Sequence, residues 1–236
     1  MEPTSIQQVL AGMARTRSMA VAADSHHFIV LSLLNQWMKE VAAPNVTGVL
    51  LDFGCGGQPY RDLFLPHISS YLGADVAPAA GVALDILITP GQPLALPTAS
   101  VDTLLSSQVL EHVPNPHAYL AECRRLLQPS GKLIITVPMQ WRHHEEPYDF
   151  LRFTRYGLEH LLQSNGFKIL DLRPCGGALA LLGQLLCNIL STRGVRSKLL
   201  YRLINRSALW LDRRYPDYGD TINWNCIATL QEKEPK

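Results

Sequence analysis

Short runs of β-branched and aliphatic residues recur along this chain, and stretches with helical spacing separate them. Five of these runs lie at residues 49–53, 71–76, 101–107, 132–138 and 167–172. Strands that alternate with helices pair in parallel, because each helix carries the chain back to the start of the next strand. The run KLIITV is almost continuously apolar, which is typical of a strand covered on both faces. The alternation therefore predicts an α/β fold with a doubly wound sheet.

Helical spacing is clearest in two segments between these strands. Residues 116–128 carry an apolar stripe with Pro116 in the first turn, and we expect residues 129–131 (Pro-Ser-Gly) to end this helix. Residues 154–164 open with Thr154 as the N-cap and end before an Asn-Gly pair.

Two further regions are predicted to be helical but depart from the alternation. Residues 5–40 indicate one or two amphipathic helices ahead of the first strand. Residues 177–211 indicate two more, inserted between the strand at 167–172 and a last strand at 223–230. We expect both regions to cap the ligand-binding edge of the sheet or to pack at its side.

The composition limits the classes to which the protein can belong. With 236 residues, 47% of them apolar, the chain can bury the core of one large domain. The chain has 21 Lys and Arg against 20 Asp and Glu, a formal net charge of +1. This near-neutral charge excludes a nucleic-acid binder that works by bulk phosphate neutralisation. Five cysteines without a CxxC pair predict neither a disulfide framework nor a zinc site, and they favour a reducing compartment.

The N-terminus and the apolar stretches of the sequence indicate where in the cell the protein is located. The N-terminal MEPTSIQQ has no secretory signal pattern, and the longest apolar stretch, residues 178–190, is interrupted by polar residues and too short to span a bilayer. We therefore expect a soluble, cytoplasmic protein without stable membrane insertion.

A glycine-rich turn carries the strongest functional signal. The segment LDFGCGG, residues 51–57, leads from an apolar strand through three glycines to a plausible helix start. Glycines let the backbone approach a ligand closely, and a helix N-terminus presents free N–H groups. The spacing is not GxGxxG, because Pro59 stands at the third glycine position, and there is no P-loop. Taken alone, the segment is also compatible with an ordinary strand-to-helix turn.

An acidic residue further along favours a nucleoside ligand. Asp75 stands near the end of the second strand, nineteen residues after Gly56. An acid at this point of such a fold can accept hydrogen bonds from both hydroxyls of a ribose. We therefore predict that Asp75 binds a ribose and is not simply a surface turn residue.

Together these segments resemble the class I S-adenosylmethionine-dependent methyltransferases, in particular a broad bacterial group that acts on small molecules. The resemblance covers about residues 47–172 and rests on LDFGCG, LGADV, LDI, SSQVLEHVPNP, AYLAECRRLLQPSGKL and TVP. It implies a Rossmann-like, mostly parallel seven-stranded sheet with an antiparallel last strand and S-adenosyl-L-methionine as the cofactor. The whole chain is then expected to be one methyltransferase domain. Its parts are an N-terminal helical cap (1–45), a cofactor-binding core (46–175), a helical insertion (176–222) and the last strand (223–231).

The resemblance assigns nine residues to the cofactor, in the glycine turn and at the ends of the following strands. They are Asp52, Gly54, Cys55, Gly56, Asp75, Val76, Asp85, Ile86 and Gln108. Those of the glycine turn are expected to line the methionine portion, Asp75 to hold the ribose, and Asp85 with Ile86 to meet the adenine. No lysine lies between residues 49 and 60, which agrees with a cationic sulfonium and not with a phosphate ligand.

The segment after the fifth strand is the candidate acceptor site. Residues 139–154 are dense in histidine and acidic residues and open at the carboxyl edge of the sheet, where ligands bind in such folds. A histidine there can remove a proton from a hydroxyl during methyl transfer. The same residues could hold a metal, although neighbouring histidines point apart in extended chain, or could only support the following helix. Many members of the resembled group carry a similar HxxPxDxxRFT segment.

From this segment we predict His144 as the general base, with His143 second, and no metal. His112 could face the pocket but is expected to be structural. The predicted acceptor contacts are Trp141, Glu145, Tyr148, Asp149 and Arg152.

A basic pattern follows in the predicted helical insertion. Lys198, Arg202, Arg206 and Arg213 share one helical face, opposite the apolar residues Leu200, Leu203, Ile204 and Leu211. A solvated face of a helix packed on the core explains this pattern. The alternative is peripheral contact of residues 178–214 with an anionic acceptor or lipid headgroup.

The leading functional hypothesis is methyl transfer from S-adenosylmethionine to a small molecule or glycan, with oxygen as the preferred acceptor atom. In-line displacement on an activated carbon mainly requires positioning and exclusion of water, so no catalytic triad is needed. The [DN]PP[YF] segment of amino-directed nucleic-acid enzymes and the ligand set of metal-dependent catechol enzymes are both missing. The alternatives are a non-catalytic module that senses the cofactor or binds a partner and, less favoured because of the loop spacing, a nicotinamide oxidoreductase.

Overall fold

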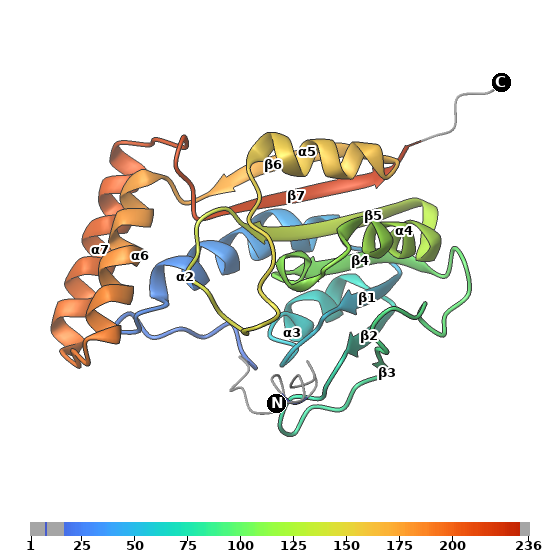
Figure 1. Cartoon of the computed structure of the whole chain (residues 1–236), viewed down its shortest axis with the longest axis horizontal. Coiled ribbons are helices and arrows are strands. Elements are labelled where there is room, and N and C mark those ends of the chain that lie inside the picture. The colour runs from blue at the N-terminus through green and yellow to red at the C-terminus, as the bar shows by residue number, and fades with distance from the viewer. Residues whose placement is uncertain (1–7, 9–16, 232–236) are drawn as a thin grey trace.

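The computed structural model describes residue 8 and residues 17–231, and it contains one seven-stranded sheet flanked by helices (Figure 1). The strands follow the order β3-β2-β1-β4-β5-β7-β6. Their bounds are β1 Val49–Phe53, β2 Ser70–Asp75, β3 Ile86–Leu87, β4 Val101–Ser107, β5 Leu127–Pro138, β6 Phe167–Cys175 and β7 Asn223–Leu230. β1 to β5 pair in parallel with one another, whereas β7 is antiparallel to both β5 and β6. The predicted doubly wound sheet with an antiparallel last strand is confirmed.

The helices lie between these strands and at one end of the sheet. The described helices are α2 Phe28–Trp37, α3 Arg61–Phe64, α4 Pro116–Leu126, α5 Arg155–Ser164, α6 Ala178–Thr192 and α7 Lys198–Arg214, with a π-helical turn η1 Met38–Ala42 and 3-10 turns η2 Ala43–Asn45, η3 Leu65–His67 and η4 Leu110–His112. Of the one or two helices predicted over residues 5–40, the structure describes α2, and the part of this prediction at residues 5–7 and 9–16 lies outside the described residues.

α4 and α5 begin where the sequence predicts, because a polar side chain caps each of them. Oδ1 of Asn115 accepts a hydrogen bond from the N–H of Ala118 at 3.1 Å. Oγ1 of Thr154 accepts one from the N–H of Gly157 at 3.1 Å. Each bond satisfies one of the N–H groups that have no partner inside the first turn of a helix.

The end of α4 differs from the prediction. The helix stops at Leu126, and residues 129–131, which were expected to form the terminating turn, lie within β5. Leu127 already pairs with Val101 of β4. Pairing with the neighbouring strand thus outweighs the local turn preference of Pro-Ser-Gly, which a single sequence does not reveal.

Neighbouring residues of β4 show how the sheet is covered. Leu104 packs in a buried cluster with residues of α4 and α5, whereas Leu105 packs in a second cluster with residues of η1 and α3. Both leucines are fully buried. Because side chains alternate along a strand, the two clusters lie on opposite faces, and the expectation of a sheet covered on both faces is confirmed.

α6 and α7 form the predicted helical pair between β6 and β7, next to α2 (Figure 1). Pro138 at the end of β5 and Cys175 at the end of β6 both pair with Asn223, so α6 starts at the carboxyl edge of the sheet. Within the described residues, no helix combines the length and the apolar character that a membrane crossing requires.

The face of α7 that packs on the protein is not the predicted one. Its buried residues are Tyr201, Asn205, Ala208 and Asp212. Leu200 and Leu203, which were predicted on the face opposite the basic residues, are 37% and 57% exposed. The polar residues of the buried stripe are retained because they have partners: Asn205 donates to the carbonyls of Ala23 and Ser25 at 2.9 Å each.

Candidate active site

The glycine-rich turn after β1 depends on glycine for its shape. Gly54 has φ 93° and Gly56 has φ 53°, both in the left-handed region. A Cβ atom on Gly54 would lie 2.4 Å from Cγ2 of Val109, so the segment after β4 packs directly against the turn. The N–H groups of Gly54 and Cys55 donate to the carbonyl of Ala74 in β2 at 2.8 and 3.0 Å. The bare backbone of the turn thus lies between the ends of β1, β2 and β4.

The helix after this turn is shorter and later than the sequence suggested. α3 begins only at Arg61 and has four residues. A ligand at the turn therefore does not meet the N-terminus of a helix that follows Gly57.

Asp75 connects the end of β2 to the glycine turn. Its Oδ2 accepts a hydrogen bond from the N–H of Gly56 at 2.7 Å, and its Oδ1 accepts one from the N–H of Val76 at 2.7 Å. The residue is 5% exposed. Its Oδ1 also accepts a longer hydrogen bond from the N–H of Ala77 at 3.4 Å. The fold thus places the acid and the turn in direct contact, across nineteen residues of sequence.

Asp52 lies in β1 immediately before the turn and is nearly fully buried. Burial raises the pKa of its carboxyl to about 7, and the negative charge of Asp75 adds to this effect. The hydroxyl of Tyr71 opposes the shift by donating to Oδ2 of Asp52 at 2.5 Å. Two acidic side chains therefore lie close together at a turn that contains no cation of its own.

The remaining predicted cofactor residues lie at the same edge. Asp85 accepts a hydrogen bond from the N–H of Gly73 at 2.7 Å, which fixes its carboxylate against β2. Ile86 starts β3 and pairs with Ala74. Gln108 follows β4 with φ 56°, and its Nε2 donates to Oγ1 of Thr136 at 3.1 Å.

Backbone hydrogen bonds attach the loop after β5 to η4. The N–H groups of Phe150 and Leu151 donate to the carbonyl of Glu111 at 2.9 and 3.2 Å. Within the loop, Arg152 donates to both carboxylate oxygens of Asp149 at 2.6 and 2.7 Å. This bidentate pair holds the pKa of the Asp149 carboxyl well below its usual range.

His144 of this loop and His112 of η4 meet at the carboxyl edge. Their rings pack edge to face with centroids 4.6 Å apart. Burial, followed by the neighbouring His112, lowers the pKa of His144 and so favours the neutral ring. Its backbone N–H donates to Oδ2 of Asp149 at 3.1 Å, which fixes the position of the residue.

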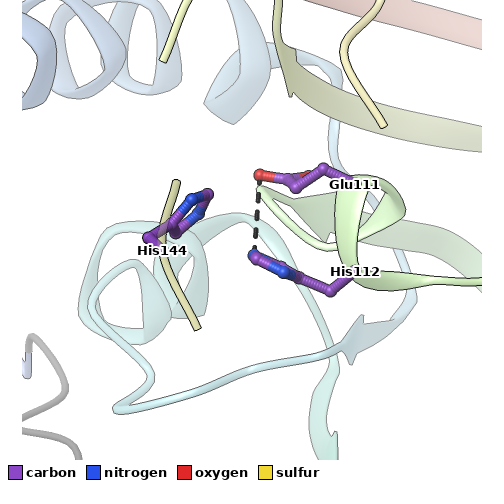
Figure 2. A group of neighbouring side chains, drawn as sticks. All are labelled: Glu111, His112 and His144. Carbon is purple, nitrogen blue, oxygen red and sulfur yellow. Dashed lines mark ion pairs between the residues drawn. The ribbon is translucent and has the colours of Figure 1, made fainter. Parts of the chain in front are cut away.

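Glu111 completes this group (Figure 2). Its side chain is fully buried, and burial raises the pKa of its carboxyl to about 8. Figure 2 shows that Glu111 and His112 extend from the same turn toward His144. One ligand atom from each of the three residues lies within 4.8 Å of the others, a geometry that could hold a metal ion.

Comparison with known proteins agrees with this geometry. Residues 51–135 match the model of a methyltransferase domain. A ubiquinone biosynthesis O-methyltransferase of Cereibacter sphaeroides is 36% identical over 120 residues, which are 45% of this chain and 49% of the relative. The protein of the same name from Roseobacter denitrificans is 31% identical over 117 residues, 44% of this chain and 47% of the relative. The chain thus spans about half the length of the curated relatives it matches.

Solved structures share the whole fold. A methyltransferase described as SAM-dependent from Archaeoglobus fulgidus has a TM-score of 0.55 and 16% identity, covering 85% of this chain and 94% of that one. Residues 51–135 belong to the methyltransferase-domain family, and the fold of the chain is that of a SAM-dependent methyltransferase. The [4+2]-cyclase SpnF, with a TM-score of 0.57, 17% identity and coverage of 97% and 92%, also has this fold. The fold alone therefore does not determine the reaction.

The structure separates the residues predicted for the acceptor site. His144 and Glu145 lie beside His112, and Oε2 of Glu145 is 3.7 Å from Nε2 of His112. The side chain of His143, by contrast, is 85% exposed. His112, expected to be structural, faces the cluster.

The other predicted acceptor residues build the loop. Asp149 and Arg152 bind each other, and Arg152 also donates to the carbonyl of Trp141 at 3.2 Å. The carbonyl of Tyr148 lies 2.7 Å from Nδ1 of His112.

Glu111 was not among the predicted site residues. The available signal was a single charged residue, directly before a histidine, inside the apolar segment VLEHV. A charged side chain in such a segment is almost never fully buried unless it has a partner, so it is a candidate for a site residue.

Proposed function

We propose that the protein binds S-adenosyl-L-methionine at the glycine turn and transfers its methyl group to a hydroxyl oxygen of a small molecule or glycan. The observation that carries this proposal is the contact between Asp75 and Gly56, which joins the ribose-binding acid to the bare backbone of the turn. The curated relatives named above are O-methyltransferases, which supports oxygen as the acceptor atom.

The residues at the turn fit this cofactor. Asp52 and Asp75 provide negative charge near the expected position of the methionine portion and the ribose, and residues 49–60 contain neither lysine nor arginine. The ammonium and sulfonium groups of the cofactor would find opposite charge at these two carboxyl groups. Asp85 and Ile86 remain our proposal for the adenine, and Val76 and Gln108 for the sides of the site.

The cofactor supplies an activated methyl group, and the chain must hold an acceptor oxygen in line with it and keep water out. The loop at residues 139–154 is suited to this because the Asp149–Arg152 pair and the bonds to Glu111 hold it against η4. We assign Asp149 and Arg152 to positioning His144, since they use their charges on each other. Trp141, Glu145 and Tyr148 remain proposed acceptor contacts.

His144 remains our proposed general base for the reaction without a bound metal. Its Nδ1 lies 3.4 Å from Oδ2 of Asp149 and 3.3 Å from the carbonyl of Arg142, so a proton on Nδ1 leaves the lone pair on Nε2. His143 is our second candidate, although its exposure makes exclusion of water from the reaction harder.

Calorimetry of cofactor binding tests the proposal. We expect Asp75→Ala to weaken binding of S-adenosylmethionine by about tenfold to a hundredfold, since two charge-assisted hydrogen bonds are lost. Asp62→Ala, which removes an exposed carboxylate from α3, is the matched control and should bind like the unaltered protein. If Asp75→Ala binds the cofactor undiminished, the cofactor site is not the one described.

Turnover separates the enzyme from its main alternative, a module that only senses the cofactor or binds a partner. Incubation with methyl-labelled cofactor and a panel of hydroxylated metabolites and glycans should transfer label to at least one acceptor. Tight cofactor binding without transfer to any of them would favour the module.

A further inference from the structure

We infer that Glu111, His112 and His144 bind a divalent transition-metal cation, of the class of Mn²⁺, Fe²⁺ or Zn²⁺, beside the cofactor site. The inference deepens the proposed function and rests on it for the role of the cation, but not for its binding. It revises the expectation of no metal that the sequence alone supports.

The first observation is the convergence of the ligand atoms. Nε2 of His112 lies 3.9 Å from Oε1 of Glu111, and all three ligand atoms lie within 4.8 Å of one another. Ligands at about 2.0–2.2 Å from a common cation are separated by roughly 3–4 Å, so small side-chain movements close the site. Figure 2 shows the three side chains directed at a common point.

The second observation is the carboxyl group of Glu111. It is fully buried, and neither oxygen has a hydrogen-bond partner among the residues that the structure describes. Burying a carboxyl group without partners is costly, and proteins compensate such groups with an opposite charge or a metal. A cation between Glu111 and the two histidines would supply this compensation.

The third observation is the orientation of the imidazole rings. Nδ1 of His112 lies 2.7 Å from the carbonyl of Tyr148, which can only accept, so Nδ1 carries the proton and Nε2 has the lone pair. Nδ1 of His144 faces the carbonyl of Arg142 and the carboxylate of Asp149 in the same way. Metal-binding histidines typically donate their second N–H to a carbonyl or carboxylate, which fixes the tautomer and the ring.

The ligand set indicates the class of cation. Two imidazoles and one carboxylate suit first-row transition metals, whereas Mg²⁺ and Ca²⁺ prefer oxygen ligands. Three protein ligands leave coordination positions open, as in catalytic sites. Glu145, with Oε2 3.7 Å from Nε2 of His112, is placed to serve as a further ligand or as a proton acceptor.

The position of the cluster suggests its role. Val109, two residues before Glu111, packs against Gly54 of the cofactor turn, so the cluster adjoins the site of methyl transfer. A cation lowers the pKa of a hydroxyl that contacts it. The acceptor O–H bond would break with the proton passing to solvent or Glu145, the oxygen would bond to the methyl carbon, and the carbon–sulfur electron pair would remain on sulfur. His144 would then act as a ligand and not as the base.

Metal binding by the full chain tests the inference directly. The protein is treated with a chelator, dialysed, and titrated with Co²⁺, followed by its visible d–d absorption, and with Mn²⁺ and Zn²⁺ by calorimetry. We expect one cation per chain. Glu111→Gln and His144→Asn should each weaken binding by at least about tenfold to a hundredfold, since changes even to residues behind the ligands have effects of this size. His160→Asn, an exposed histidine on α5, is the control and should bind normally.

Absence of stoichiometric binding to the unaltered protein, or binding unchanged in both ligand variants, would overturn the inference. The first outcome does not depend on whether a variant folds. Cofactor affinity is measured on the same samples. If the unaltered protein binds the cofactor but no cation, the metal site is rejected and the proposed function stands. If the unaltered protein does not bind the cofactor, the proposed function is rejected, whether or not a cation binds.

Discussion

Asp52 illustrates at the residue scale how burial, and not residue type, sets the charge of a group in the site. Its pKa of about 7 exceeds the ordinary value of 3.8 because the side chain is buried. Between pH 3.8 and about pH 7, Asp52 holds a proton in the cofactor-free folded chain but has released it in the unfolded chain. The contribution of Asp52 to folding stability therefore falls as the pH rises through this window.

We predict that the melting temperature of Asp52→Asn rises relative to that of the unaltered cofactor-free protein as the pH increases from 4 to 7, because only the unaltered protein carries the buried Asp52 carboxyl. The contribution of Asp52 is on the order of a few kcal/mol. The measurement is thermal unfolding across this pH range for both proteins. The cationic cofactor should raise the melting temperature of the unaltered protein more at pH 8, where Asp52 is ionised, than at pH 6. An equal pH dependence in Asp52→Asn would assign the effect to other groups.

At the scale of elements, the helical pair α6–α7 is held together by a cap that one helix provides for the other. The N-cap residue of α6 is Gly177, which has no side chain to offer. Asp212 of α7 takes its place: Oδ1 accepts from the N–H of Ala180 at 3.0 Å and Oδ2 from that of Gly177 at 3.1 Å. Close packing supports the contact, since a Cβ on Gly183 would lie 2.3 Å from Cβ of Ala208.

We predict that Asp212→Ala destabilises the protein by about 1–2 kcal/mol, because two N–H groups at the helix start lose their acceptor. The expected fall in melting temperature is about 2–8 °C. Arg213 is an exposed neighbour of Asp212, and Arg213→Ala should change the melting temperature little. This variant controls for the loss of a charge at this end of α7. Cofactor affinity should stay within about twofold in both variants if the pair folds independently of the glycine turn. An unchanged melting temperature in Asp212→Ala would show that α6 is stable without this cap.

At the scale of the whole molecule, α6 and α7 expose apolar surface next to positive charge. Leu182 is 63% exposed, Leu203 57% and Trp210 64%. A shallow groove lined almost only by apolar side chains runs between the two helices. On α7, the exposed basic residues Arg206 and Arg213 border this surface. Exposed leucines beside basic residues are typical of peripheral contact with anionic lipid.

We predict that the protein sediments with vesicles that contain phosphatidylglycerol and not with pure phosphatidylcholine vesicles. The variant Arg206→Glu/Arg213→Glu should lose this binding through charge repulsion, and added salt should weaken it in the unaltered protein. Lys168→Glu, an exposed charge reversal on β6, is the control. Sedimentation that does not depend on anionic lipid would leave the basic residues as a solvated helix face.

Much of the core of this protein follows from local patterns in its sequence. Runs of apolar residues predicted β1, β2 and β4 to β7, and in an inner strand such as β1 this pattern arises because both faces of the strand are buried. Thr154 indicated the start of α5 because its hydroxyl can cap a helix. The glycines after β1 indicated a turn whose backbone conformation is strained for residues with a side chain. Each of these signals lies within a few residues of the feature that it specifies.

The tertiary structure decided what depends on contacts between distant segments. Sheet pairing ended α4 at Leu126, and the partners of Asn205 and Asp212 determined which face of α7 is buried. Glu111 and His144, thirty-three residues apart, form one cluster only because β4 and β5 are neighbours whose ends reach the same edge. Burial and hydrogen-bond partners are properties of the packed chain, so the charge of Asp52 and the exposed carboxyl-edge position of His143 could be read only from the fold.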